Sequence, residues 1–215
     1  MLFGMSAEPS QPGYPAERTK AFIDAAVAIA LTLLILPLME SVGEVAGEGE
    51  DALTWLQDHR GQLVSFVLSF VLIALFWLIH HHLFTRVERL TPRLFWLLAA
   101  WMLTIVWLPV ATAVSGRMED SDDTARALYI GSLALTALAS LGVRLYVRAH
   151  PALHSVSDDE MVRGVALDLS LLLLFGAALL IGWLVPAIGY FALLLTMLSG
   201  VVQKLLRRML GARSD

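Results

Sequence analysis

Ionisable side chains at the entrance of an apolar helix are the first candidates for chemistry in this sequence. Arg18 and Asp24 precede a run from Ala25 to Met39 that is almost wholly apolar. Charged groups at membrane depth are costly, so they are functional candidates by default. At 100° per residue, one face of this helix carries an aromatic, three aliphatic and one acidic side chain, with Thr32 at its edge: Phe22, Ile29, Leu33, Leu36 and Glu40. On periodicity alone, such a stripe is most often a packing surface.

A second group of polar candidates ends the next apolar segment. Trp77 is followed at helical spacing by three consecutive histidines that begin at His80. Consecutive helical residues point in different directions, and no cysteine or nearby carboxylate completes a ligand set, so we expect no metal site. The first group stands at the start of its helix and the second at the end of the next helix, so both lie on the same side of the membrane. We therefore expect a structural polar network near the membrane interface, made of Arg18, Asp24, Trp77 and His80 or His81.

The elements that position these groups are predicted to be membrane spans. The chain has 215 residues, of which 58% are hydrophobic, and they collect in blocks of about 20, the length that crosses a hydrocarbon core. The sequence predicts an all-α membrane protein with six transmembrane helices, the last two forming a tight hairpin. The predicted spans lie near residues 22–39, 62–84, 94–115, 125–147, 164–184 and 186–205.

Charges differ between alternate loops. Twelve of the 15 basic residues fall on the side of the N-terminus, and three on the other: Arg60, Arg117 and Arg126. By the positive-inside rule the first side is the cytoplasm, so we expect a multi-pass plasma-membrane protein with both termini cytoplasmic. The second side carries ten of the 19 acidic residues. They form either a solvated surface or a vestibule that concentrates cations.

The later spans carry further polar side chains. We expect Arg144 and Arg148 to reach the cytoplasmic interface with their charged ends. Asp168 lies about one turn inside its span, where it can pair with Arg163 or Arg144 or take part in a proton relay. Three tryptophans are expected to anchor the third span at the interfaces: Trp96, Trp101 and Trp107.

The pattern Arg18-x-x-x-Phe22-Ile-Asp24, with Ala-Ile-Ala-Leu-Thr-Leu-Leu-Ile-Leu-Pro shortly after it, resembles the first helix of the transmembrane protein 175 family. These are potassium-permeable channels of endolysosomes with bacterial homologues. The family motif is Arg-x-x-x-Phe-Ser-Asp, so Ile23 stands where the family usually has serine. The resemblance implies a bacterial member whose first helix lines the pore. It implies a constriction at Ile29, Leu33 and Leu36, with Thr32 and Glu40 as further pore-lining residues.

The resemblance also implies an assembly. The family pairs the arginine and aspartate of its motif with a tryptophan and a histidine of the second helix. Animal members carry two repeats per chain and form dimers, whereas this sequence contains the motif once. A homotetramer is therefore expected. Residues 17–208 would form the six-helix channel domain between flexible cytoplasmic tails at 1–16 and 209–215.

The function predicted from these observations is a potassium-permeable cation channel. The Thr-Val-Gly-Tyr-Gly carbonyl filter is absent, so aliphatic rings of the first helix are expected to act as gate and filter. No catalytic or nucleotide-binding motif occurs, so we expect no enzyme and no cofactor besides the permeant potassium ion. The expected partners are further copies of the chain, the lipid bilayer and monovalent cations, and not nucleic acid. Two alternatives stay open: a proton-coupled secondary transporter that uses Asp24 or Asp168, and a non-conducting membrane scaffold.

Overall fold

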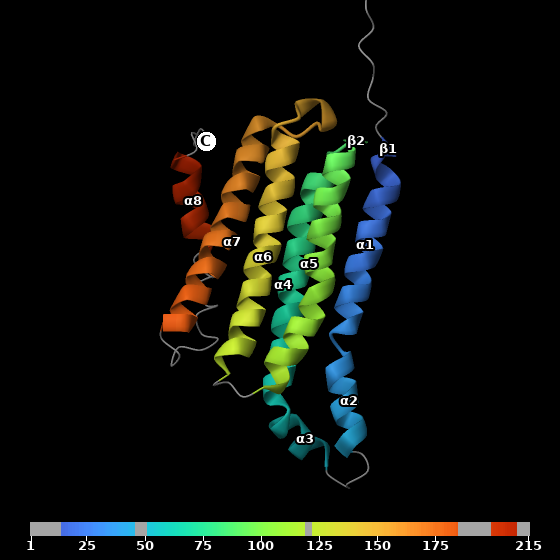
Figure 1. Cartoon of the computed structure of the whole chain (residues 1–215), viewed down its shortest axis with the longest axis vertical. Helices are drawn as coiled ribbons and strands as arrows, with labels where there is room; N and C mark the ends of the chain where they lie inside the picture. Colours follow the sequence, from blue (N-terminus) through green and yellow to red (C-terminus); the bar gives the residue numbers. More distant parts are fainter. Residues whose placement is uncertain (1–13, 46–50, 119–121, 185–198, 210–215) are drawn as a thin grey trace, which may run out of the picture.

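The computed structural model describes residues 14–45, 51–118, 122–184 and 199–209. In these ranges the chain forms long helices that lie side by side (Figure 1). The elements, in order, are β1 (Tyr14–Pro15), α1 (Ala16–Leu33), α2 (Leu36–Val45), α3 (Ala52–Asp58), α4 (Arg60–Phe84), β2 (Arg89–Leu90), α5 (Pro92–Arg117), α6 (Asp123–Arg148), the 3-10 helix η1 (Pro151–Leu153), α7 (Asp158–Leu184) and α8 (Ser199–Met209).

Among the described residues, five helical segments are long and apolar enough to cross a membrane. They are Ala16–Gly43, Arg60–Phe84, Pro92–Arg117, Asp123–Arg148 and Asp158–Leu184. The first five predicted spans are therefore confirmed, and the protein is a helical, multi-pass membrane protein. Most of the sixth predicted span and the hairpin before it fall on 185–198, outside the described residues. Its last part lies in α8, beside α7 in Figure 1, where the Gln203 side chain donates to the Arg163 carbonyl at 3.4 Å.

The first span is interrupted between α1 and α2. The break falls between Leu33 and Leu36, at Leu34 and Ile35. The cause is Pro37, which lacks the N–H that would bond the Leu33 carbonyl and whose ring crowds that carbonyl. A tighter turn fills the gap, with the Ile35 N–H donating to Thr32 O at 3.3 Å.

Backbone hydrogen bonds join the connections at the end of the bundle that carries most of the arginines. β1 pairs with β2, so that Tyr14 lies opposite Leu90. The Glu88 N–H donates to Leu153 O at 2.8 Å, and the Ser155 N–H donates to Arg86 O at 2.9 Å. The start of α1 is therefore tied to the α4–α5 connection, which is tied in turn to the α6–α7 connection. Residues 14–16, expected to belong to the flexible tail, form β1 and the first residue of α1.

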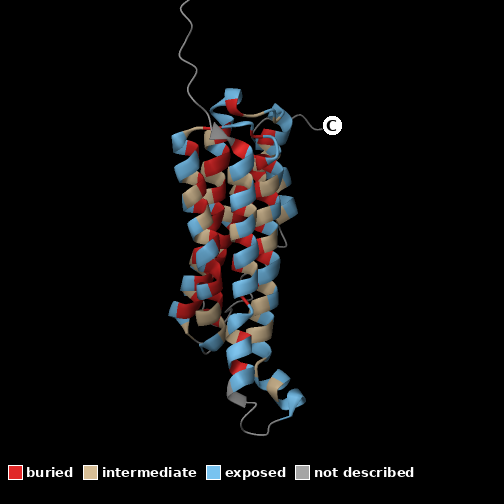
Figure 2. Ribbon diagram, turned by 90° about the vertical axis from the view of Figure 1, so that its right-hand side faces the viewer, coloured by how far each residue is buried: buried red, intermediate tan, exposed pale blue. Residues whose placement is uncertain are grey.

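One face of α1 and α2 packs against α4 and α5. Its small and aliphatic side chains recur every three or four residues and are at most 5% exposed, the spacing of a helical packing face: Ile23, Val27, Ala30, Leu34 and Leu38. Figure 2 views the bundle from the side where α1 lies and shows many exposed residues on the outer surface over a buried interior. The packing face is therefore distinct from the stripe that contains Ile29.

Candidate functional site

The opposite face of α1 and α2 is uncovered within the chain. We call it the exposed stripe: Phe22, Ile29, Leu33, Leu36 and Glu40. Ile29 is 59% exposed, Leu33 37% and Leu36 49%. Since α1 is already seated through its other face, the exposed stripe does not pack inside its own chain. It is available to lipid or to further copies of the chain.

The two polar residues assigned to the pore wall have partners within the chain. The Thr32 hydroxyl donates to the Ile29 carbonyl at 2.7 Å, one turn earlier in α1. Glu40 of α2 forms an ion pair with Arg117 at the end of α5, and both side chains remain largely exposed. The exposed stripe therefore ends at an ion pair that joins two spans.

The expected polar network forms in part, through Asp24, Trp77 and His81. The Trp77 indole N–H donates to Asp24 Oδ1 at 2.8 Å, and His81 Nδ1 lies 3.8 Å from the same oxygen. The rings of Trp77 and His81 pack with their centroids 5.1 Å apart. Asp24 therefore faces α4, on a different side of α1 from the exposed stripe, and fixes α1 to the second span.

The other two residues lie elsewhere. His80 is buried in the bundle, with its ring stacked 3.9 Å from that of Trp101 and 4.8 Å from that of Phe84. One residue along a helix is a rotation of 100°, so His80 turns toward α5 when His81 faces α1. Arg18 is exposed, and within the described residues it makes no hydrogen bond or ion pair with Asp24, Trp77 or His81.

Several acidic residues of the second side serve as helix caps or ion-pair partners. Asp51 caps α3 by accepting the Thr54 N–H at 2.8 Å, and this hydrogen bond lowers the pKa of the Asp51 carboxyl. Asp122 caps α6 in the same way, and Asp123 pairs with Arg126. With Glu40, these groups already have partners in the chain. The side chains of five further acids lie outside the described part: Glu44, Glu48, Glu50, Glu119 and Asp120.

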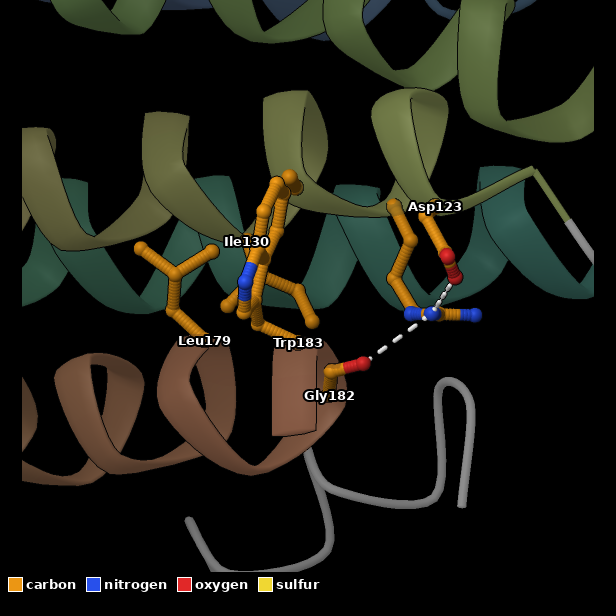
Figure 3. Close-up of a pocket in the computed structure, with 7 residues that line it drawn as sticks. Asp123, Ile130, Leu179, Gly182 and Trp183 are labelled. Atoms are coloured by element: carbon orange, nitrogen blue, oxygen red, sulfur yellow. Dashed lines mark hydrogen bonds and ion pairs between the residues drawn. The ribbon is translucent and has the colours of Figure 1, made fainter. Parts of the chain in front are cut away.

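Two buried arginines of α6 contact α7, one in its first half and one near its C-terminal end. Arg144 pairs with Asp168, and both side chains are almost fully buried. The expectation that Arg144 reaches the interface is therefore wrong, and Arg144 rather than Arg163 is the partner of Asp168. Near the C-terminal end of α7, Arg126 pairs with Asp123 and donates to the Gly182 carbonyl at 3.0 Å, beside a small pocket (Figure 3).

Each buried arginine lies over a glycine of α7. A Cβ at Gly164 would stand 2.9 Å from Nε of Arg144 and closer still to its Cζ and Nη1, and one at Gly182 would stand 3.4 Å from Nε of Arg126. The arginines are 18 residues apart, five full turns of helix, and so lie on one face. This spacing was visible in the sequence and could have identified the pair.

Buried hydroxyls and indoles also link the spans, and sequence reasoning missed them. The Ser69 hydroxyl lies 2.8 Å from the hydroxyls of both Tyr129 and Thr112. Trp101, expected at an interface, is fully buried and donates to Ser140 at 2.8 Å. The sequence of α6 does contain a pattern that indicates a buried polar face, because four polar residues recur at four-residue intervals: Ser132, Thr136, Ser140 and Arg144.

The other two tryptophans differ from Trp101. Trp96 is 72% exposed, as an interfacial anchor would be. Trp107 is partly exposed and donates to Ser132 at 3.0 Å.

Over the described ranges, no group of three or more histidine, aspartate and glutamate residues could hold a metal ion. The candidate site therefore consists of the apolar exposed stripe and of the Asp24–Trp77 contact that holds α1 in place.

The first three spans are similar in sequence to known ion channels. The family model for the endosomal/lysosomal potassium channel TMEM175 matches residues 18–109, which contain the exposed stripe, the Asp24–Trp77 contact and most of α5. The chain is 26% identical to a potassium channel of a Chryseobacterium species, over 57% of the chain and 59% of that protein. It is 32% identical to a potassium channel of Streptomyces collinus, over 57% of the chain and 58% of that protein.

A vertebrate relative matches a similar share of the chain. The endosomal/lysosomal proton channel TMEM175 of Gallus gallus is 34% identical over 58% of the chain and 26% of that protein. The matched region spans less than two thirds of each of these relatives. The family is one of ion channels and not of enzymes. Residues 18–109, less than half of the 215-residue chain, are therefore similar to the TMEM175 family.

Proposed function

We propose that this protein is a potassium-permeable cation channel whose pore is lined by the exposed stripe of α1 and α2. The observation that carries the proposal is the division of the first span into two faces. One face is buried against α4 and α5, and the other presents Ile29, Leu33 and Leu36 uncovered. A span that served only to anchor the chain would not need its own hydrogen bond to the second span through Asp24.

A homotetramer would place four copies of the exposed stripe around one axis. Closed cyclic assemblies bring the same surface of each copy to the symmetry axis. Each aliphatic residue of the exposed stripe would then form a ring of four side chains. The Asp24–Trp77 hydrogen bond, 2.8 Å long, would hold each α1 at a fixed rotation, so that the aliphatic side chains point inward.

The rings would act as both gate and filter. A narrow aliphatic ring is unfavourable to water and blocks ions by dewetting. An ion that passes must lose part of its hydration shell, and potassium loses water at lower cost than sodium. The selectivity would therefore be modest and would depend on ring width. The break at Leu34 and Ile35 lies between the Leu33 and Leu36 rings and would set their relative orientation.

The relatives support a channel over the two alternatives. Two bacterial relatives are named potassium channels, and the vertebrate relative is named a proton channel. A proton-coupled carrier would require an available carboxylate. Asp24 accepts from Trp77 and Asp168 is paired with Arg144, so neither favours a carrier.

Reconstitution of the purified full chain into liposomes tests the proposal. Under opposed potassium and sodium gradients, we expect a reversal potential displaced toward that of potassium, with flux that rises linearly with ion gradient. A saturating flux coupled to protons would instead indicate a carrier. Absence of flux at verified incorporation would indicate a scaffold, and either result would contradict the proposed function.

A further inference from the structure

A crevice lies between α4 and α7, at the end of the bundle where the arginines gather. Its volume is about 580 Å³, within the range of roughly 300–1,000 Å³ typical of small-molecule sites. Its walls are two helical stripes with the same spacing, from Leu75 to His82 on α4 and from Glu160 to Leu167 on α7. Each stripe repeats every three and four residues, so one continuous face of each helix lines the crevice.

The crevice is charged at its rim and apolar along its depth. Arg86 follows the end of α4, and Arg163 lies in the second turn of α7. Deeper in the spans the walls are aliphatic, with Leu75, Leu78 and Leu167. Leu78 is 45% exposed. A cationic rim above an apolar channel matches a molecule with an anionic head and a hydrocarbon tail.

The two rim arginines are held by the backbone around them. The Arg86 carbonyl accepts the Ser155 N–H at 2.9 Å, and the Arg163 carbonyl accepts from Gln203 at 3.4 Å. Among the described residues, neither guanidinium forms an ion pair with a carboxylate; Arg163 Nε donates to the Asp159 carbonyl at 3.3 Å. Both positive charges are therefore available to an anion.

The other charged groups of the crevice do not offset this rim. Arg144 lies at the back, and its charge is met by Asp168. Glu160 is the acidic residue of the described lining, and one of its carboxylate oxygens lies 3.5 Å from the Ser157 N–H. The rim therefore has one negative charge, on Glu160, and two positive charges, on Arg86 and Arg163, so its net charge is positive.

We propose that this crevice binds one anionic phospholipid, with its phosphate between Arg86 and Arg163 and an acyl chain along Leu75, Leu78 and Leu167. Basic pockets between spans on the cytoplasmic side are suited to anionic headgroups, and the positive-inside rule puts this rim on that side. The site is separate from the exposed stripe. Its occupancy does not depend on whether the chain conducts.

Native mass spectrometry of the purified full chain gives the first test. Phosphatidylglycerol and phosphatidylcholine are titrated separately, and we expect phosphatidylglycerol to bind at least tenfold more tightly. The double variant Arg86→Gln/Arg163→Gln should lose that preference. Arg93→Gln removes an exposed arginine of α5 near the same end and outside the crevice, so it should change the affinity less than twofold.

Three results of this titration would overturn the proposal. Equal binding of the two lipids would remove the requirement for an anionic head. Unchanged phosphatidylglycerol binding by the double variant would place the lipid elsewhere. Displacement of the lipid by millimolar inorganic phosphate would indicate a site for free anions that takes no acyl chain.

A cysteine variant provides a second test that leaves both arginines in place. The chain has no cysteine, so Leu78→Cys introduces a single thiol. Phosphatidylglycerol vesicles should slow its reaction with a membrane-permeant maleimide at least threefold relative to phosphatidylcholine vesicles. Leu103→Cys, at a 70% exposed position of α5, should react equally in both. Equal rates for Leu78→Cys would overturn the proposal, and so would a disulfide between two copies through Leu78→Cys, because a second chain would then fill the crevice.

Discussion

The indole nitrogen of Trp77 donates a 2.8 Å hydrogen bond to Asp24 Oδ1 and so joins the second membrane span to the first. The two residues are 53 positions apart in sequence. His81 packs on Trp77 and lies 3.8 Å from the same oxygen. This contact gives the carboxylate at the entrance of an apolar helix a structural role: it sets the rotation of α1 and with it the direction of the exposed stripe.

Removing the Trp77 indole N–H should weaken the packing of α1 against α4 and lower the stability of the protein. Trp77→Phe keeps an aromatic ring but loses the donor, and hydrogen bonds between spans contribute about 0.6 kcal/mol on average and up to 1.7 kcal/mol. We expect a loss of that size, measured by unfolding in mixed detergent. Trp96→Phe, at a 72% exposed position, is the control and should leave stability nearly unchanged.

Asp24→Asn should affect assembly or expression more than ion preference. The amide oxygen of asparagine can still accept from Trp77, but the negative charge beside His81 is lost. The yield of assembled protein and the potassium-to-sodium permeability ratio are measured on the same preparation. Normal assembly with a changed ratio would mean that Asp24 lines the ion pathway, contrary to this account.

The proposed homotetramer with α1 innermost predicts a crosslinking pattern. In a chain without cysteine, Ile29→Cys should form disulfides between copies under mild oxidation, because residues that meet at a narrow axis approach within bonding distance. Val27→Cys, 2% exposed against its own bundle, should not. Native mass measurement of the same samples should give four chains. A clean monomer, or crosslinking through Val27→Cys alone, would contradict the arrangement.

Gly164→Ala should destabilise the bundle far more than an ordinary glycine substitution. The added Cβ would overlap the Arg144 guanidinium and separate it from Asp168, and breaking a buried ion pair costs about 3–5 kcal/mol. Gly176→Ala is the matched control on α7, because a Cβ there meets nothing within 4 Å, and alanine favours a helix by up to about 1 kcal/mol. Equal unfolding midpoints for the two variants would show that the Arg144–Asp168 pair contributes little.

The first five spans were predictable because hydrophobic blocks of membrane length are a strong signal. The contact of Asp24 with Trp77 and His81 was also foreseen, since charged and indole groups at one end of neighbouring spans satisfy one another. The sequence left the choice between His80 and His81 open, because adjacent helical residues face different neighbours and the choice depends on helix rotation. That rotation is decided by packing against Trp101 and Phe84, which sequence spacing does not contain.

Other departures have similar causes. Arg144 was expected at the interface because arginine near a span end usually reaches water. The structure buries it because Gly164 leaves room and Asp168 supplies the opposite charge, and both come from another helix. Pro37 marks the helix break in the sequence, because its ring meets the Leu33 carbonyl in the preceding turn.

Ion flux through Leu33→Asn and Leu36→Asn tests the central claim most directly. Each variant is reconstituted at matched incorporation, with Leu34→Asn as a comparison at a position 2% exposed against the bundle. If Leu33 and Leu36 form the constriction, asparagine should hydrate it, so that flux rises several-fold while the preference for potassium over sodium falls. Leu34→Asn should lower assembly rather than alter permeation. Unchanged flux and unchanged ion preference in both Leu33→Asn and Leu36→Asn would contradict the account, and the pore would then have to lie outside the exposed stripe.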